Sequence, residues 1–248
     1  MNHAKTMIKQ TRSGIGYYQS EQLIQYKKVE HFFSDRNVDF SQLEALSNHF
    51  QLEKNSIIIG KQTHGDRVVI VHHQNKNELF ENIDAFITCE KGICIAVKTA
   101  DCTPVLLFDP IKNVIAAIHS GWKGTVQNIV GQTVGQMVSY FGVEPQNLIA
   151  AIGPCIGQLN YEVGEEVAIQ FKLLFPNEPD LLKPLPDNGS KWLLNVRLAI
   201  VDQLIESGVH PELIDCSTEC TFENVADFHS ARREGAGTGR MINGIFLK

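Results

Sequence analysis

Six short apolar runs follow one another between residues 56 and 120, each closed by polar residues, glycine or proline. Their high content of β-branched residues is typical of strands. The predicted strands are 56–60, 67–73, 83–88, 93–99, 104–109 and 113–120, with later strands at 148–153, 213–217 and 243–248. Because a series of consecutive strands precedes the helices, the sequence predicts an α/β (α+β) fold. We expect a mixed β-sheet flanked by helices, in a single domain over residues 1–248.

Three segments of the second half have helical periodicity. Apolar residues recur at helical spacing over 123–141, which predicts an amphipathic helix. Further helices are predicted over 163–175, which ends before a proline, and over 192–209, which closes near a glycine. Between them, the four prolines of 175–191 predict a surface loop.

Composition narrows the classes of partner. The chain has 248 residues and a net charge of −6, which argues against nucleic-acid binding, because phosphate neutralisation requires clustered lysine and arginine. No apolar run is long enough to span a bilayer, and the N-terminal residues lack the apolar core of a signal peptide. The six cysteines form no CxxC pair, so we expect free thiols and a cytoplasmic location. We expect a monomer that binds small molecules.

Two histidines and one cysteine stand where predicted elements end. His64 lies in a glycine-bounded turn, Cys102 in a short loop between two strands, and His119 at a strand end before a glycine. Sites on rigid scaffolds are usually built at such positions. Two histidines and one cysteine make a sensible set of zinc ligands that leaves a fourth position for water or substrate. The plainer interpretation is a buried structural thiol and two histidines bonded to backbone carbonyls, and spacing alone favours it.

Five motifs occur in order along the chain: KQTHGDRV, DAFITCEKGICIAVKTADCTPVLLFD, AAIHSGWKGT, IGPCIGQLNYEVGEEV and FHSARREGAGTGRMINGIFL. Together they resemble the YfiH/laccase-domain family over roughly residues 30–248. The resemblance implies a fold similar in its core to deamidating cysteine hydrolases such as cytotoxic necrotizing factor. It also implies a zinc ion held by His64, Cys102 and His119.

The resemblance further implies purine nucleoside chemistry. The expected reactions are phosphorolysis of adenosine, inosine and methylthioadenosine to the base and (methylthio)ribose 1-phosphate, and hydrolytic deamination of adenosine. Zinc with an open position lowers the pKa of bound water to roughly 7, which suits deamination. Asp101, beside the predicted ligand Cys102, is expected either to orient a ligand or move a proton, or to cap a turn.

Phosphorolysis also requires donors that hold phosphate, and arginine supplies bidentate ones. The candidate substrate- and phosphate-binding residues are Arg36, Gln62, Arg232 and Arg233, and Arg240 lies in the same glycine-containing loop as the last two. The plainer interpretation of this loop is a solvated basic surface. The family carries an aromatic residue where this chain has Ala231, which removes one expected stacking partner of the substrate.

Three other functions remain open. In an amidase, Cys102 would be the nucleophile and His119 its base, acting on a cell-wall precursor such as a mis-built UDP-MurNAc-amino acid. In a polyphenol oxidase, copper would replace zinc, although a laccase requires several copper centres with many histidines and this chain has nine. In a non-enzymatic partner protein, the metal would be structural, which a fourth protein ligand would favour.

Overall fold

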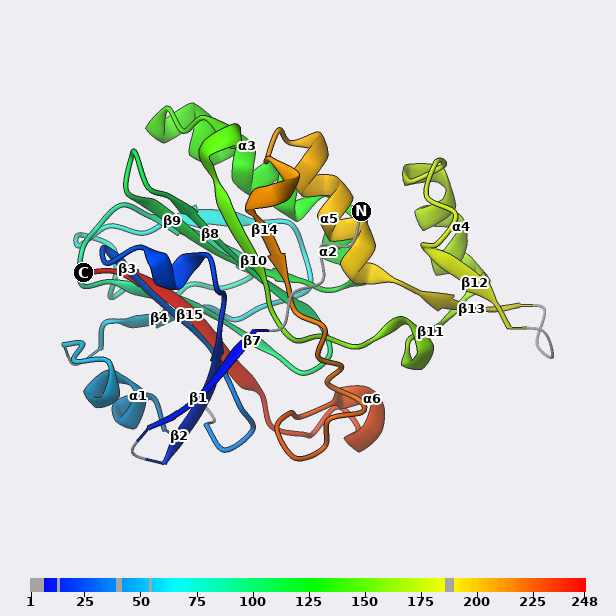
Figure 1. The fold of residues 1–248 in the computed structure, drawn as a ribbon, viewed down its shortest axis with the longest axis horizontal. Helices are drawn as coiled ribbons and strands as arrows, with labels where there is room; N and C mark the ends of the chain where they lie inside the picture. Colours follow the sequence, from blue (N-terminus) through cyan, green and yellow to red (C-terminus); the bar gives the residue numbers. More distant parts are fainter. Residues whose placement is uncertain (1–6, 13, 39–41, 54, 186–189) are drawn as a thin grey trace.

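The computed structural model describes residues 7–12, 14–38, 42–53, 55–185 and 190–248. Two six-stranded sheets with mixed strand directions pack against each other, and helices lie on their outer faces (Figure 1). The predicted fold class is confirmed, but two large sheets replace the single sheet that we expected.

The first sheet carries the predicted zinc ligands at one end. It has the order β14-β10-β8-β9-β6-β5 and consists of β5 (Val68–Ile70), β6 (Ala85–Thr88), β8 (Thr103–Asp109), β9 (Val114–Ser120), β10 (Ile149–Ile152) and β14 (Ile214–Cys216). The central strands β8 and β9 are buried along their whole length, in keeping with their continuous apolar sequence. Their antiparallel register pairs Thr103 with Ser120 and Pro104 with His119. The start of β8 and the end of β9 therefore meet.

The second sheet includes elements that the sequence pattern did not predict. It has the order β1-β2-β3-β15-β7-β4 and consists of β1 (Ile8–Arg12), β2 (Ile15–Gln19), β3 (Val29–Ser34), β4 (Ile57–Ile59), β7 (Cys94–Thr99) and β15 (Met241–Leu247). Strands β1 to β3 contain many polar residues and lack a continuous apolar run. Helix α1 (Leu43–His49), beside this sheet, was also not predicted.

The prediction of one helix over 123–141 is wrong in one respect, because the structure has two helices in this region. These are α2 (Trp122–Val126) and α3 (Ile129–Phe141). Asn128, between them, has a left-handed backbone with φ 57°, and its side chain accepts the N–H of Gly131 as the N-cap of α3. A capping asparagine therefore interrupts an apolar pattern that continues across the break.

A small antiparallel sheet replaces parts of two predicted helices and of the predicted loop. It consists of β11 (Glu162–Gly164), β12 (Leu182–Pro184) and β13 (Lys191–Leu194). The remaining helices are α4 (Glu165–Leu174) and α5 (Val196–Glu206), each shorter than predicted. The local period of the sequence is helical at both positions. The helices are nevertheless shorter than predicted because β11 and β13 pair with each other. Residues 186–189 of the predicted loop lie outside the described residues.

Shorter helical segments connect the main elements. They are α6 (Ala231–Glu234) and the 3₁₀ helices η1 (Leu23–Gln25), η3 (Pro145–Asn147), η4 (Gln158–Asn160) and η5 (Pro211–Leu213). Figure 1 shows α6 at the same side of the molecule as the small sheet, below β11. The segment between β14 and β15 thus contacts Asp101, just before the start of β8, through Ser230 and Arg232.

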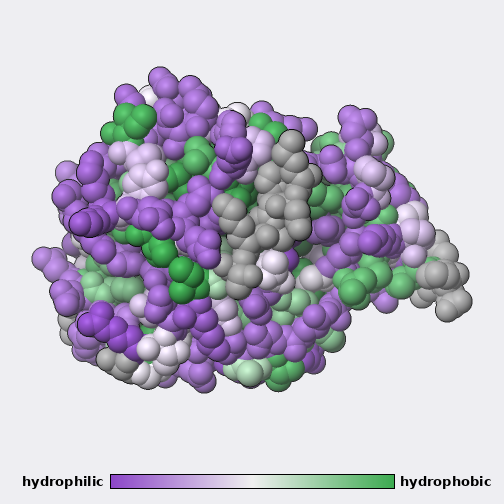
Figure 2. Space-filling model, in the orientation of Figure 1, coloured by the Kyte–Doolittle hydropathy of each residue, from purple (hydrophilic) through white to green (hydrophobic). Residues whose placement is uncertain are grey.

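Three apolar layers hold the elements together. One lies between the first sheet and helices α3 and α5, one between the two sheets, and one between the second sheet and α1. The surface in Figure 2 is predominantly hydrophilic, with small and separate apolar areas. Among the described residues, no helix has the length and apolarity needed to cross a membrane.

Candidate active site

The β8–β9 hairpin brings two of the predicted ligands together. Cys102 directly precedes β8 and His119 is the penultimate residue of β9, so both lie at the same end of the first sheet. His64 reaches this end from the turn between β4 and β5. The ligand atoms of the three side chains all lie within 4.8 Å of one another. Within the described residues, this is the one group of three or more His, Cys, Asp or Glu side chains close enough to share a metal ion.

A fourth residue, Asp84, orders this cluster. Its fully buried carboxylate lies 2.7 Å from Nδ1 of His119. It also accepts the backbone N–H groups of Thr63 (3.1 Å), His64 (3.0 Å) and Gly65 (3.0 Å). Because Nδ1 of His119 faces Asp84, Nε2 is the ring nitrogen left for a metal ion. One carboxylate therefore positions both histidines.

The sequence analysis missed Asp84. It stands at the beginning of the predicted strand 83–88, where an aspartate is equally typical of a turn. The available signal was a carboxylate inside a run of otherwise apolar residues, because such a group must find hydrogen-bond donors when it is buried. Its partners His64 and His119 are too distant in sequence for this signal to identify them.

Two backbone features allow the close approach of the ligands. His64 has φ 61°, a conformation that is uncommon for residues other than glycine. Its N–H bond to Asp84 holds the turn in that conformation. At Gly121, a Cβ atom would lie 2.9 Å from Sγ of Cys102 and 3.2 Å from Cδ2 of His64. A side chain at this position would therefore displace two of the three ligands.

The cluster favours the ionised thiol. Burial opposes ionisation of Cys102, but the charge of His119 and hydrogen bonds from both histidines lower the pKa of the thiol to about 6. Burial also opposes protonation of His119, yet Cys102 and Asp84 raise its pKa to about 9. For Asp84, hydrogen bonds from His119 and the backbone outweigh burial and lower the pKa of the carboxyl. A metal ion would take the place of the imidazole proton, since ligand histidines are neutral.

An electropositive pocket of about 500 Å³ contains the cluster. Four cationic side chains line it, and these are Lys61, Lys98, Arg232 and Arg240. The one carboxylate among its described lining residues is Asp101. Burial and then the charge of Arg240 lower the pKa of Lys98, so two of the cations repel each other. Binding of an anion would relieve this repulsion.

Asp101 binds the C-terminal segment. Its carboxylate accepts hydrogen bonds from the hydroxyls of Thr221 (2.7 Å) and Ser230 (3.0 Å), and from the backbone N–H of Arg232 (2.7 Å). These contacts connect the loop that carries Cys102 to the short helix α6, which carries Arg232. This connection adds to the two roles that the sequence suggested, which were a ligand or proton contact and a turn cap.

Arg232 and Gln62 both line the pocket. The Arg232 guanidinium donates to the carbonyl oxygen of Glu162 (2.9 Å) and lies 5.5 Å from the ring centre of Tyr161. The Gln62 amide exchanges two hydrogen bonds with the backbone of Lys98, at 2.8 and 2.7 Å. Gln62 therefore holds the strand that carries Lys98.

Arg233 and Arg36 do not belong to the described pocket lining. Arg36 donates to the carbonyl oxygen of Val225 (2.7 Å) and lies 3.3 Å from the carboxylate of Glu234. The Arg233 guanidinium donates to the carbonyl oxygens of Thr221, Phe222 and Phe228. Both arginines therefore bond the C-terminal loops, and the structure does not place them among the residues that line the pocket.

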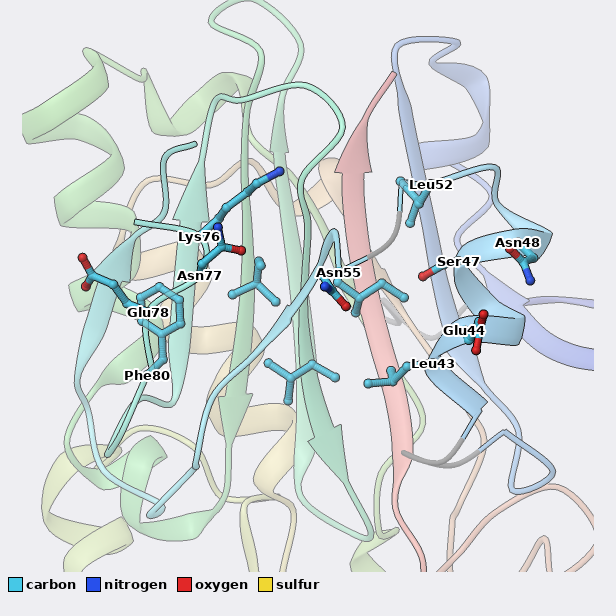
Figure 3. A pocket seen from close by; sticks show the side chains of 13 residues that line it. Leu43, Glu44, Ser47, Asn48, Leu52, Asn55, Lys76, Asn77, Glu78 and Phe80 are labelled. Atoms are coloured by element: carbon cyan, nitrogen blue, oxygen red, sulfur yellow. The ribbon is translucent and has the colours of Figure 1, made fainter. Parts of the chain in front are cut away.

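A second pocket, of about 580 Å³, lies beside the edge strand β4, between α1 and residues 76–80 (Figure 3). Its lining combines leucine, isoleucine and phenylalanine side chains with amides, two glutamates and one lysine. None of the predicted site residues lines it. The smaller pocket is therefore the candidate active site, because it contains the possible metal ligands and the four cationic side chains.

The family model for the multi-copper polyphenol oxidoreductase laccases matches residues 34–248. The chain belongs to this family. The resemblance to YfiH/laccase-domain proteins is thereby confirmed. Although the family description names several coppers, the described residues of this chain offer a single three-ligand group.

Similar proteins carry the names of nucleoside enzymes. A purine nucleoside phosphorylase of Bacteroides thetaiotaomicron is 35% identical over 198 residues, covering 77% of this chain and 73% of that protein. The adenosine deaminase RL5, from an unknown prokaryotic organism, is 33% identical over 210 residues, covering 82% of this chain and 79% of that protein. The crystal structure of YlmD from Geobacillus stearothermophilus has the same fold, with a TM-score of 0.87 at 21% identity over 98% of this chain and 99% of that chain.

Replacing the ordering carboxylate tests its role. We expect Asp84→Asn to weaken zinc binding by about 10- to 100-fold, because the amide no longer fixes the His119 ring with a charged acceptor. Competition with a chromophoric chelator measures this affinity. Asp66→Asn is the matched control, since Asp66 is in the same turn and bonds Gln132 instead of the ligands. Equal zinc affinities of the two variants and the wild type would contradict the role of Asp84.

Alkylation of Cys102 tests metal ligation directly. In the zinc-loaded protein we expect slow labelling by iodoacetamide, because the metal holds the thiolate. After chelation, the labelling rate should rise with a midpoint near pH 6, following the pKa of Cys102 at about 6. Cys89 is the internal control. Its side chain is exposed, and partial burial and then the charge of Glu90 raise the pKa of its thiol. Rapid labelling of Cys102 while zinc stays bound would rule out ligation by this thiol.

Proposed function

We propose that the chain is a zinc-dependent purine nucleoside phosphorylase that also deaminates adenosine. The observation that carries the proposal is a set of metal ligands within an electropositive pocket. The pocket volume of about 500 Å³ falls in the range of small-molecule sites. The names of the relatives support the choice of purine nucleosides and phosphate as substrates.

Zinc fits the donor set of His64, Cys102 and His119. One thiolate and two imidazoles leave a fourth coordination position open, and a carboxylate bonds the far nitrogen of one imidazole, as is usual around ligating histidines. When bound, zinc supplies Lewis-acid chemistry and lowers the pKa of a bound water to about 7, which suits hydrolytic deamination at neutral pH. The protein contributes the fixed orientation of the ligands through Asp84.

The cations of the pocket would hold phosphate. In phosphorolysis, a phosphate oxygen attacks the anomeric carbon of the ribose and the purine leaves, so the phosphate must be held beside the sugar. Lys98, Arg232 and Arg240 line one pocket with the metal ligands and provide the positive charge for this anion. Asp101 keeps Arg232 in place by accepting its backbone N–H.

Tyr161 offers the aromatic surface for the substrate. It lines the pocket beside Arg232, whereas Ala231 stands where the resemblance to the family implies an aromatic residue. Burial raises the pKa of Tyr161, so the phenol stays protonated at neutral pH and can donate a hydrogen bond. We therefore assign to Tyr161 a contact with the nucleoside.

The amidase is a second candidate, which one observation favours. Cys102, His119 and Asp84 form a chain in which a thiol of lowered pKa faces an imidazole that a buried carboxylate orients. This is the order of groups in cysteine hydrolases. Removal of zinc separates the two functions, since the phosphorylase requires the ion and a thiolate nucleophile requires a free Cys102.

The assay uses the zinc-loaded protein with adenosine, in the presence and absence of phosphate. Without phosphate we expect inosine. With phosphate we expect adenine, ribose 1-phosphate and inosine, together with hypoxanthine from phosphorolysis of that inosine. All products should be lost after chelation. Arg232→Ala should reduce phosphorolysis by about 10²–10³-fold and deamination by less, because deamination needs water and no phosphate.

Arg233→Ala is the matched control for this variant. Its guanidinium bonds loop carbonyls outside the pocket, so we expect similar losses in both reactions and a lower melting temperature. Equal losses of phosphorolysis and deamination in Arg232→Ala would contradict a phosphate contact by Arg232. Release of ammonia from an amide substrate by the chelated protein, without nucleoside cleavage, would favour the amidase.

A further inference from the structure

Three cysteines outside the metal-ligand group lie close together behind the pocket wall. Cys155 and Cys220 are partners in a parallel β-bridge, and Cys216 ends β14 nearby. All three are free thiols. Bridge partners lie about 5 Å apart with their side chains on the same face of the sheet, which falls within the Cα separation of about 4.4–6.8 Å in disulfides. Cys155 and Cys220 can therefore be joined with little backbone movement.

Arg197 directs its guanidinium to this cluster. The sulfur atoms of Cys155, Cys216 and Cys220 all lie near enough to interact with it electrostatically. Its Nη2 donates to the carbonyl oxygen of Glu219 (2.7 Å), while its Nε is buried without a hydrogen-bond partner. The described interactions of this cation are thus with sulfur atoms and a carbonyl.

The two bridged cysteines differ in access. Cys155 is fully buried, whereas Cys220 is partly exposed. The sulfur of Cys220 accepts the backbone N–H of Gly157 (3.1 Å) and lies 3.6 Å from Nδ2 of Asn160. Partial exposure, N–H donors and a nearby cation are the surroundings in which reactive cysteines occur. An oxidant from solvent therefore reaches Cys220 before Cys155.

We propose that Cys220 and Cys155 form a redox pair, which a hydroperoxide oxidises to a disulfide. The Cys220 sulfur attacks one peroxide oxygen, the O–O bond breaks, and an alcohol, or water from hydrogen peroxide, leaves with the thiol proton. The Cys155 sulfur then attacks the sulfenic acid of Cys220, the S–O bond breaks, and the hydroxide leaves as water with the second thiol proton. A small dithiol restores both thiols by exchange.

Both cysteines directly precede a residue that bonds Asp101 of the pocket. Ile156, which follows Cys155, lines the pocket and donates its backbone N–H to the carbonyl oxygen of Asp101 (3.0 Å). Thr221, which follows Cys220, donates its hydroxyl to the carboxylate of Asp101 (2.7 Å). A disulfide would therefore tie together the two segments that hold Asp101. This inference is independent of the substrate on which the enzyme acts.

The test treats the zinc-loaded protein with hydrogen peroxide at neutral pH. Peptide mapping by mass spectrometry under non-reducing conditions identifies the linked cysteines, and zinc is measured in parallel to monitor oxidation of Cys102. We expect a Cys155–Cys220 peptide in most molecules, which dithiothreitol reverses. Linkage of either cysteine to Cys216, or no linkage while the exposed Cys89 is oxidised, would overturn the proposal.

Single variants distinguish the two sulfur atoms. In Cys155→Ser we expect Cys220 to accumulate as a sulfenic acid that dimedone traps, because its partner is missing. Cys89→Ser is the matched control outside the cluster and should form the disulfide as the wild type does. Thermal unfolding checks that each variant is folded. A folded Cys155→Ser protein with no dimedone adduct at Cys220 would also overturn the proposal.

Discussion

The candidate site depends on a single buried carboxylate. Asp84 accepts the N–H groups of the turn that carries His64 and contacts Nδ1 of His119, so one side chain sets the positions of two ligands. A buried carboxylate without partners would be strongly unfavourable. The left-handed conformation of His64 would likewise be costly without the hydrogen bonds that hold the turn. The hydrogen bonds between the turn and Asp84 therefore offset both the cost of burying the carboxylate and the cost of the left-handed conformation. The register of the β8–β9 hairpin places Cys102 beside His119.

Sequence reasoning was most successful where local pattern and burial agree. Strands β8 and β9 are continuous apolar runs, and the positions of Cys102 and His119 at their ends followed from that pattern. It failed where pairing between distant segments decides the structure, as in β13, whose helical periodicity gives way to pairing with β11. The role of Asp84 could not be predicted for the same reason, because its hydrogen-bond partners come from distant segments of the chain.

The sequence also could not determine which arginine of the C-terminal segment lines the pocket. Arg232 and Arg233 are neighbours in the short helix α6 and were equivalent candidates for phosphate binding. In the structure, Arg232 lines the pocket, while Arg233 bonds three carbonyl oxygens outside it. Residue type identified the segment, but the hydrogen bonds of Asp101 and the short helix α6 determine which arginine lines the pocket.

The proposed metal site has one cysteine and two histidines as its protein ligands. X-ray absorption spectroscopy at the zinc edge of the zinc-loaded protein measures these ligands directly. We expect one sulfur at about 2.3 Å and two imidazole nitrogens at about 2.0–2.1 Å, with loss of the sulfur in Cys102→Ser. Zinc without a sulfur ligand, or a sulfur ligand that persists in Cys102→Ser, would contradict the proposed site.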